Sequence, residues 1–398
     1  MLIVRFKRDI SEQIASLARQ FPALVLTGAR QTGKTTLLRE LFPQHSYVSL
    51  DLPSAAELAE RAPEQFLAEH PAPALIDEVQ YAPKLFRHLK LAIDRNRHQN
   101  GAFILTGSQK FVLMKEISDS LAGRAAIVEL ETLSLAEIAQ HGSFPTDVRE
   151  LVAAIVRGGF PDLWRDRSID SSAFYRAYLS SYLERDVRQI LNVSSLRDFE
   201  RFLRACAARS AQILDKAGLA RDIGVSSTAV NDWLSVLEAS NQVQLLEPYF
   251  ENVGKRLVKR PKLYFSDTGL LCYLLDQDES SLPRSPYLGS LWETAIYAEL
   301  RKKRDREGAR STLWFYRDAQ QREVDFVIAQ GNALHLVEAK WSENPDPRDA
   351  HGLEIVATML RERSKRSEVD TAIVCRTPHP SALGSGTRVL DLKALALT

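Results

Sequence analysis

The stretch Leu24–Leu38, LVLTGARQTGKTTLL, decides the fold of the first part of the chain. Its apolar beginning predicts a strand, and the residues from Gly28 to Thr35 match G-x-x-x-x-G-K-[ST] between that strand and a helix. In such a loop the backbone N–H groups point at phosphate oxygens, and the start of the helix adds the positive end of its dipole. The stretch therefore predicts a nucleotide site.

The residue types in this loop indicate their roles. Lys34 is placed to reach the β- and γ-phosphates, and the Thr35 hydroxyl is placed to bind Mg²⁺. The whole loop is expected to surround the phosphates, which gives the predicted binding set Gly28, Ala29, Arg30, Gln31, Thr32, Gly33, Lys34, Thr35 and Thr36.

The composition predicts a chain of two or three domains, because 398 residues exceed one ordinary hydrophobic core. A net charge of +1 gives no general attraction to DNA or to an anionic membrane, so a nucleic-acid site needs local basic patches. No apolar run approaches the roughly 20 residues that span a bilayer, and the N-terminal apolar stretch is too short for a signal peptide. Three scattered cysteines indicate neither a disulfide framework nor a zinc site. We expect a cytoplasmic protein with no membrane partner.

A second apolar run, at residues 72–76, ends in the acidic pair Asp77 and Glu78. About forty residues after a P-loop, a strand that ends in two acids fits the acidic partner of that loop. Asp77 is expected to hold Mg²⁺ by hydrogen bonds to the ligands of the ion. Glu78 is expected to polarise the attacking water as a general base.

The next predicted strand, at residues 102–105, runs into further polar residues. Ser108 is the candidate for a hydrogen bond to the γ-phosphate or the attacking water, with Thr106 as the alternative. Arg124 follows later and could neutralise charge on the γ-phosphate, from its own subunit or from a neighbour; the alternative is an arginine in a surface ion pair. Strands that alternate with helices to about residue 140 predict a parallel, doubly wound sheet.

Four motifs occur in an order that resembles a known family. They are GARQTGKTTLL at 28–38, LIDEVQYAPKLF at 75–86, ILTGSQKF at 104–111 and SLAGR at 120–124. Together they resemble bacterial AAA-type ATPases whose C-terminal part is the domain of unknown function DUF4143. Three later motifs are similar to the same family, so the resemblance covers nearly the whole chain: RGGFP at 157–161, YLERDV at 182–187 and PKLYFSDTGL at 261–270. The resemblance implies ATP and Mg²⁺ as cofactors and hydrolysis of ATP.

The middle of the chain reads as helices followed by a small DNA-binding pattern. Gly158 and Gly159 before Pro161 predict a tight bend and a domain boundary. Residues 170–215 are expected to be mainly helical. Residues 219–234 then predict a helix-turn-helix, with a turn at Gly224 and Ser226 or Ser227 as the N-cap of the second helix.

Two apolar stretches, at 243–247 and 261–265, could form the strands of a wing beside this helix pair. Phosphates would be contacted by the basic cluster between them, and base edges by the start of the second helix. The alternative is a winged helix that packs on the ATPase as a lid. The residues of the DNA hypothesis are Lys255, Arg256, Lys259 and Arg260 on the wing, and Ser227, Thr228, Asn231 and Asp232 on the helix.

After a predicted linker at 276–290, the sequence indicates a third α/β unit. A helix at 291–300 carries Glu293, and two strands joined at Gly331 and Asn332 carry the other charged candidates. Residues two apart on a strand share a face, so Glu338 and Lys340 point the same way, with Asp325 opposite on the neighbouring strand.

This arrangement resembles the D…E-x-K core of the PD-(D/E)xK nucleases. The resemblance implies that Asp325 and Glu338 bind Mg²⁺, that Lys340 activates water or stabilises phosphate, and that Glu293 is an auxiliary ligand. The alternative is a nuclease-like fold that only binds, with these charges in ordinary salt bridges. The basic run at 301–304 is either a phosphate track or a solvated helix end.

We therefore expect an α/β protein of three parts. These are a P-loop ATPase domain of AAA type with a parallel sheet at 1–140, a helical and winged helix-turn-helix domain at 141–275, and a nuclease-like α/β domain at 286–398. The main hypothesis is an ATP-driven protein associated with DNA, whose last domain cuts or grips nucleic acid. The alternative is a nucleotide-controlled switch or scaffold whose last domain only binds a partner. A homo-oligomer is an expectation from fold analogy alone.

Overall fold

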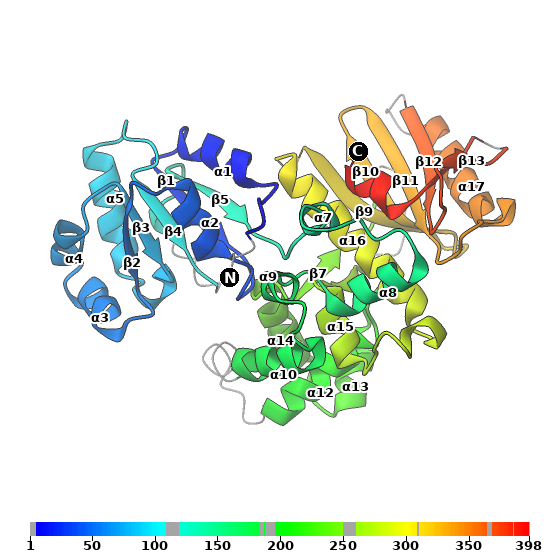
Figure 1. The fold of residues 1–398 in the computed structure, drawn as a ribbon, viewed down its shortest axis with the longest axis horizontal. Coiled ribbons are helices and arrows are strands. Elements are labelled where there is room, and N and C mark those ends of the chain that lie inside the picture. Colours follow the sequence, from blue (N-terminus) through cyan, green and yellow to red (C-terminus); the bar gives the residue numbers. More distant parts are fainter. Residues whose placement is uncertain are drawn as a thin grey trace. The chain divides into compact units, whose positions relative to one another are not determined.

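The structure is a computed structural model that describes residues 5–108, 119–183, 187, 196–249, 260–308, 310–363, 368–384 and 386–397. The chain divides into two compact units (Figure 1). The first unit consists of Lys7–Leu133 and Ala239–Asn241. The second unit consists of Met1–Phe6, Ser134–Glu238 and Gln242–Thr398.

The described part of the first unit contains a five-stranded sheet in the order β2-β3-β4-β1-β5. Its neighbouring strands are all parallel, which confirms the predicted fold class. The carboxyl ends of parallel strands lie at one edge of a sheet, so the loops that follow β1, β3 and β4 are neighbours there. The strands are β1 (Ala23–Thr27), β2 (Ser46–Ser49), β3 (Ala74–Asp77), β4 (Phe103–Thr106) and β5 (Ala125–Glu129).

Helices cover both faces of this sheet. Residues Leu24 and Leu26 pack with α1 and α2, whereas Ala23 and Val25 pack with α4 and α5 on the other face. A central strand buried on both sides reads as a continuous apolar run, which is why its sequence does not alternate. The helices are α1 (Ser11–Ala18), α2 (Lys34–Leu41), α3 (Pro53–Arg61), α4 (Pro63–Glu69) and α5 (Leu85–Arg95), with the 3-10 turn η1 (Val79–Tyr81) after β3.

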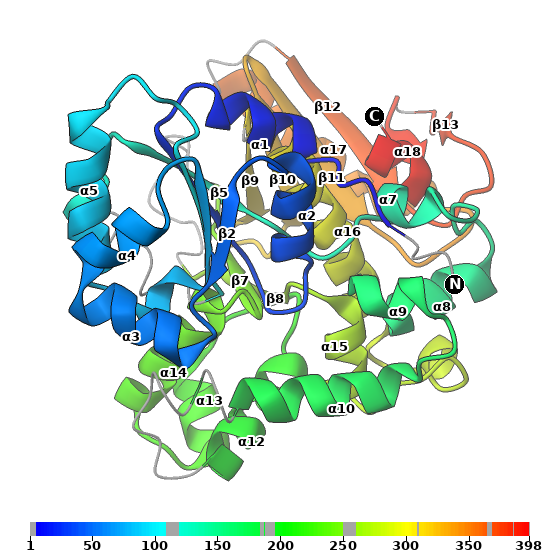
Figure 2. The same cartoon turned by 60° about the vertical axis from the view of Figure 1, so that its left-hand side comes forward.

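The second unit begins with helices and a small antiparallel sheet in the order β6-β8-β7 (Figure 2). Gly224, with φ +80°, ends α13, and the Ala229 N–H donates to Ser226 Oγ over 3.1 Å at the start of α14. The basic residues Lys255, Arg256 and Lys259 lie outside the described residues. The elements are α7 (Leu135–Ala139), α8 (Val148–Arg157), α9 (Pro161–Arg165), α10 (Ser171–Tyr182), α12 (Leu196–Ala207), β6 (Gln212–Ile213), α13 (Lys216–Ile223), α14 (Ser227–Ala239), β7 (Val243–Leu246), β8 (Lys262–Phe265), α15 (Thr268–Leu274) and η3 (Leu282–Arg284).

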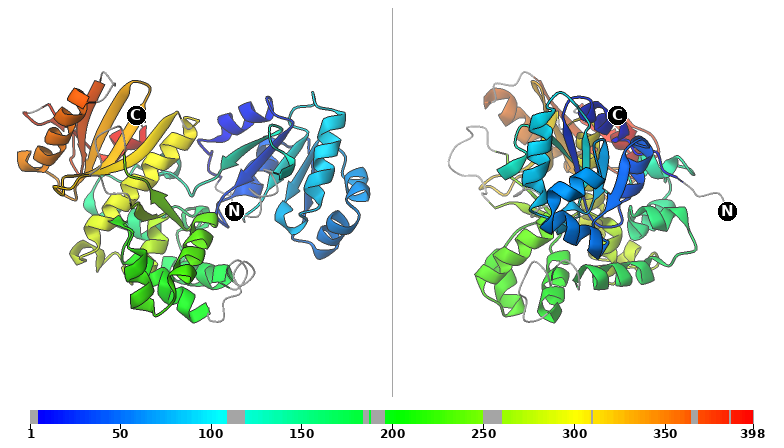
Figure 3. Two further views of the ribbon diagram at one scale, coloured as in Figure 1. Left: turned by 180° about the vertical axis from the view of Figure 1, so that it is seen from behind. Right: turned by 90° about the vertical axis from the view of Figure 1, so that its left-hand side faces the viewer.

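The same unit contains, in its described residues, a six-stranded mixed sheet in the order β13-β14-β12-β11-β10-β9 (Figure 3). Strands β9, β10 and β11 are antiparallel, with a turn at Gly331 and Asn332, whereas β12 runs parallel to β11 and to β14. One face packs with α16 and α18, and the other with α17. The elements are α16 (Leu288–Arg306), β9 (Ser311–Arg317), β10 (Glu323–Gln330), β11 (Ala333–Ala339), α17 (Pro347–Arg363), β12 (Glu368–Val374), β13 (Ser381–Ala382), β14 (Arg388–Leu390) and α18 (Leu392–Leu397).

One hydrophobic core joins the helices of the second unit to the α16 face of its six-stranded sheet. Trp292 and Ile296 of α16 belong to the same cluster of buried residues as Ile155 of α8 and Leu271 of α15. The stretch predicted as a linker, 276–290, contains η3 and the start of α16. Residues before and after this stretch therefore pack together in the same hydrophobic core.

Candidate functional site

The loop after β1 has the backbone that a phosphate site requires. Gly28 has φ +141° and Gly33 has φ +92°, conformations that residues with a Cβ rarely adopt. A Cβ at Gly28 would also overlap the carbonyl oxygen of Leu130. Helix α2 begins at Lys34, directly after the second glycine, so its free N–H groups face the concave side of the loop.

Two side chains of the loop, Thr32 and Lys34, are buried and held by backbone carbonyls. The Lys34 ammonium donates to Gly28 O over 3.1 Å and to Ala29 O over 2.8 Å. Thr32 Oγ1 donates to Ala29 O over 3.0 Å. The buried Arg8 donates to Thr32 O over 2.9 Å and so supports the loop from outside. Arg8 was missed in the sequence, where no spacing relates it to the motif.

Asp77 lies at the centre of a hydrogen-bond network next to the loop. The hydroxyl of Thr35 donates to Asp77 Oδ2 over 2.9 Å, and the Thr106 hydroxyl donates to Oδ1. The Tyr47 hydroxyl also donates to Oδ2, over 3.1 Å. Burial, together with the charge of Asp77, raises the pKa of Tyr47 above its ordinary value. The structure thus brings the Thr35 hydroxyl into contact with the Asp77 carboxylate.

Glu78 is held in an unusual backbone conformation beside this network. Its φ of +55° lies in the left-handed region, where non-glycine residues are uncommon and often functional. Its Oε2 accepts hydrogen bonds from Gln80 Nε2 over 2.5 Å and from Ser108 Oγ over 3.2 Å. Of the two residues weighed at the end of β4, Ser108 therefore contacts the Glu78 carboxylate, whereas Thr106 contacts the Asp77 carboxylate and the Glu78 N–H.

Arg124 is not placed to act on a nucleotide in its own subunit. It precedes β5, whose Ala125 pairs with Ala23 at the start of β1, whereas the loop follows the far end of β1. Five strand residues separate the two edges by about 16 Å. The guanidinium instead binds Asp94, with Nε to Oδ1 at 2.7 Å and Nη2 to Oδ2 at 3.0 Å. Arg124 thus forms the ion pair that was weighed as the alternative, and a role on the γ-phosphate from a neighbouring subunit stays a prediction.

In the second unit, a lysine lies among the carboxylates predicted to hold a metal. The ammonium of Lys262 is 2.6 Å from Glu323 Oε1, 2.9 Å from Glu293 Oε1 and 3.3 Å from Asp325 Oδ1. The Lys262 side chain is only 2% exposed. Sequence reasoning missed Lys262 and Glu323 as members of this cluster. The available signal was the motif PKLYFSDTGL, which contains Lys262.

A β-bulge directs Asp325 toward this lysine. The pairing of β10 with β9 shifts between Val324 and Val327, and both valines pack on the α17 side, whereas Phe326 packs on the α16 side. The extra residue lets Asp325 share the α16 side with Phe326. Its Oδ2 accepts from the Ala339 N–H over 2.9 Å.

Glu338 and Lys340 form an adjacent pair, as their spacing predicts. The two charged groups are 2.9 Å apart. Burial and the charge of Asp325 raise the pKa of Glu338 to about 8, and the same two causes raise the pKa of Glu293 to about 7. Glu338 Oε2 is buried and has no hydrogen-bond partner among the described residues.

The predicted metal site does not fit these positions. Across the described residues, no group of three or more His, Cys, Asp or Glu side chains is arranged to hold a metal ion. The Lys262 ammonium stands where Glu293 and Asp325 converge, so Glu293 is not available as an auxiliary ligand. The prediction of Asp325, Glu338 and Glu293 as a magnesium site is therefore corrected: two of the three surround an ammonium.

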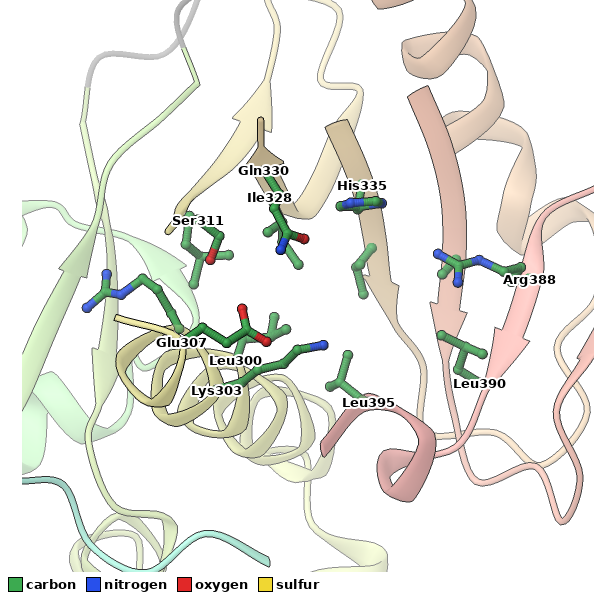
Figure 4. Close-up of a pocket in the computed structure, with 14 residues that line it drawn as sticks. Leu300, Lys303, Glu307, Ser311, Ile328, Gln330, His335, Arg388, Leu390 and Leu395 are labelled. Carbon is green, nitrogen blue, oxygen red and sulfur yellow. The ribbon is translucent and has the colours of Figure 1, made fainter. Parts of the chain in front are cut away.

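The basic run at 301–304 is not an open phosphate track. Lys302 is paired with Glu299 at 3.2 Å, Arg304 binds Asp305, and Arg301 is buried. Lys303 points into a cavity of about 210 Å³ between the end of α16 and the sheet (Figure 4). The cavity has an aliphatic floor that includes Leu300, Ile328, Val337, Leu390 and Leu395.

The parallel sheet, the glycine loop after β1 and the acids after β3 define a P-loop protein of AAA type. The profile of an AAA domain matches residues 20–139, and that of the domain of unknown function DUF4143 matches residues 288–395. A third profile, of the domain of unknown function DUF8612, matches residues 148–281. These matches confirm the resemblance inferred from the motifs.

Two mycobacterial proteins match most of the chain. Uncharacterized protein Rv2008c of Mycobacterium tuberculosis and Uncharacterized protein Mb2031c of Mycobacterium bovis are each 33% identical over 349 residues. The match covers 87% of this chain and 76% of each relative. The chain belongs to the family of these proteins, AAA-type ATPases with a C-terminal DUF4143 domain.

Among solved structures, a Walker-type ATPase of Pyrococcus abyssi is similar, with 17% identity and a TM-score of 0.44. The match covers 68% of this chain and 96% of that one. A similarity this low says nothing about activity. In the part of the chain that the structure describes, no helix is both long and apolar enough to cross a membrane.

Proposed function

We propose that the protein hydrolyses ATP at the loop after β1, with Glu78 as the general base. The observation that carries this proposal is the junction of two separate motifs, where Thr35 of the loop donates to Asp77 at the end of β3. Glu78 follows Asp77 directly, which would bring its carboxylate toward the third phosphate of a nucleotide bound in the loop. An acid at that position can take the proton of an attacking water.

The donor chemistry of this site fits Mg²⁺. A hydroxyl from Thr35 and a carboxylate from Asp77 supply the oxygen ligands that this hard cation prefers, directly or through water. When bound, Mg²⁺ would neutralise charge on the β- and γ-phosphates. Lys34 would exchange the carbonyls of Gly28 and Ala29 for phosphate oxygens. Ser108 and Gln80 would hold the Glu78 carboxylate in place.

The test is ATP turnover by the full chain and by Glu78→Gln. We expect Glu78→Gln to lower kcat by about 10²–10⁴-fold, because it removes the base, while nucleotide affinity is retained. Lys34→Ala should lose nucleotide binding as well, measured with a fluorescent ATP analogue. Glu69→Gln, at an exposed carboxylate of α4 in the same unit, is the matched control and should turn over ATP like the wild type. Unchanged kcat in Glu78→Gln would contradict the assignment.

We further propose that the helix pair α13–α14 and the strands beside it bind DNA. This proposal is supported by the exposed polar side chains at the start of α14, which are Ser227, Thr228, Asn231 and Asp232. Strands β7 and β8 flank the basic cluster in sequence, as the strands of a wing would. The alternative, a lid on the ATPase, requires no DNA affinity.

The DNA proposal predicts a specific salt dependence. The affinity for a labelled duplex should fall linearly with salt on logarithmic axes, because each phosphate contact releases counterions. Replacing Lys255, Arg256 and Lys259 together by alanine should reduce that slope by about three, about one for each lost contact. An affinity that depends neither on salt nor on these residues would favour a protein partner, and with it the nucleotide-controlled switch.

A further inference from the structure

The ammonium of Lys262 lies among three carboxylates, the side-chain type that binds divalent metals. We propose that Lys262 is the permanent cation of the carboxylate cluster Glu293, Glu323 and Asp325. In this role it takes the place of a divalent metal, so that the DUF4143 domain binds a partner without cutting nucleic acid. The inference goes beyond the ATPase proposal and does not depend on it.

The number of carboxylates matches the hydrogen-bonding capacity of the ammonium. A lysine ammonium has three N–H donors, and three carboxylates lie within 3.3 Å of it. The ring centre of Phe315 is 5.6 Å from the Lys262 nitrogen, which adds a cation–π contact inside the core. A hydrated divalent ion cannot enter between Glu293 and Asp325 unless this ammonium leaves.

The carboxylates also need positive charge beside them. Carboxylates gathered at a metal site repel one another, and the ion normally relieves that repulsion. Here Lys262 contacts three of the carboxylates, Arg317 lies 3.0 Å from Glu323, and Lys340 lies 2.9 Å from Glu338. Three basic side chains of the chain itself thus lie against four carboxylates and offset most of their charge.

The two central acids, Glu293 and Asp325, already accept hydrogen bonds from other groups. Asp325 uses one oxygen for Lys262 and the other for the Ala339 N–H. Glu293 Oε1 accepts from the Tyr264 hydroxyl over 2.5 Å as well as from Lys262. Both oxygens of Asp325 and one oxygen of Glu293 are therefore already in use.

Lys262 also joins two parts of the unit. It belongs to β8, which pairs with β7 and β6 beside the helix pair α13–α14. Its partners Glu293 and Asp325 belong to α16 and β10 of the DUF4143 domain. The cluster therefore links the proposed DNA-binding segment to the last domain, which suits a domain that holds a partner rather than one that cleaves it.

The test is metal binding by the full chain without nucleotide, in a Lys34→Ala background that leaves the P-loop empty. Mn²⁺ binding is measured by titration calorimetry and by electron paramagnetic resonance. The protein with Lys262 should show no saturable site, whereas Lys262→Met should gain one saturable site, since three carboxylates then face each other without a cation. Adding Asp325→Asn to Lys262→Met should remove the new site.

Two controls keep this test decisive. Lys302→Met removes another largely buried, paired lysine of the same unit and should gain no site. If Lys262→Met does not fold, Asp325→Asn and Glu338→Gln are compared with the parent chain, and neither should change Mn²⁺ binding. The proposal is overturned if the parent binds one Mn²⁺ that either substitution removes. It is equally overturned if the wild type cleaves plasmid DNA and Lys340→Ala does not.

Discussion

At Gly158 the backbone has φ +69°, and a Cβ would overlap the Tyr175 hydroxyl and the Asp267 carboxylate. Asp267 is the centre of a buried network, since it accepts from Tyr175 Oη over 2.8 Å and from the Gly159 N–H over 2.8 Å. It also caps α15 through the Gly269 N–H. The tight bend predicted from the two glycines is therefore present, but it lies inside the second unit.

Replacing Gly158 by alanine should destabilise the second unit by about 2–4 kcal/mol, because strain at positive φ adds to the overlap. The measurement is urea unfolding of the full chain followed by tryptophan fluorescence. Gly289→Ala is the matched control, since Gly289 lies in α16 with open space around its Cα. It should leave stability unchanged or raise it by up to about 1 kcal/mol. Equal midpoints for the two variants would contradict this account.

At the scale of single elements, local pattern was sufficient for the strand, loop and helix from β1 to α2. Glycines allow the backbone of that loop, and no distant residue is needed to recognise it. Strand β10 shows where local pattern fails. Strict alternation would put the side chains of Asp325 and Phe326 on opposite faces of the sheet, whereas the bulge puts both on the α16 side. A bulge depends on pairing with β9, so the sequence of β10 alone could not indicate it.

At the scale of the whole second unit, the shared core makes a specific prediction about fragments. Residues 286–398 expressed alone should lack cooperative unfolding, because Trp292 and Ile296 would lose their packing against α8 and α15. Lys262 would be absent as well, leaving Glu293 and Asp325 without their cation. Residues 134–398 should unfold cooperatively.

Thermal unfolding followed by circular dichroism, with limited proteolysis, distinguishes these outcomes. The fragment 134–398 serves as the positive control, since it keeps nearly all of the shared core. A protease-resistant, cooperatively unfolding 286–398 fragment would show that the DUF4143 domain has a sufficient core of its own.

The sequence by itself determined the nucleotide loop, the acids Asp77 and Glu78 at the end of β3, the parallel sheet and the pairing of Glu338 with Lys340. Each depends on residues close in the chain, on turn chemistry, or on a period of two or 3.6 residues. Only the tertiary structure decided that Arg124 pairs with Asp94 and that Lys262 fills the predicted metal site. Lys262 is 31 residues from Glu293 and 63 from Asp325. Contacts at such separations are set by packing and strand register, which no local pattern records.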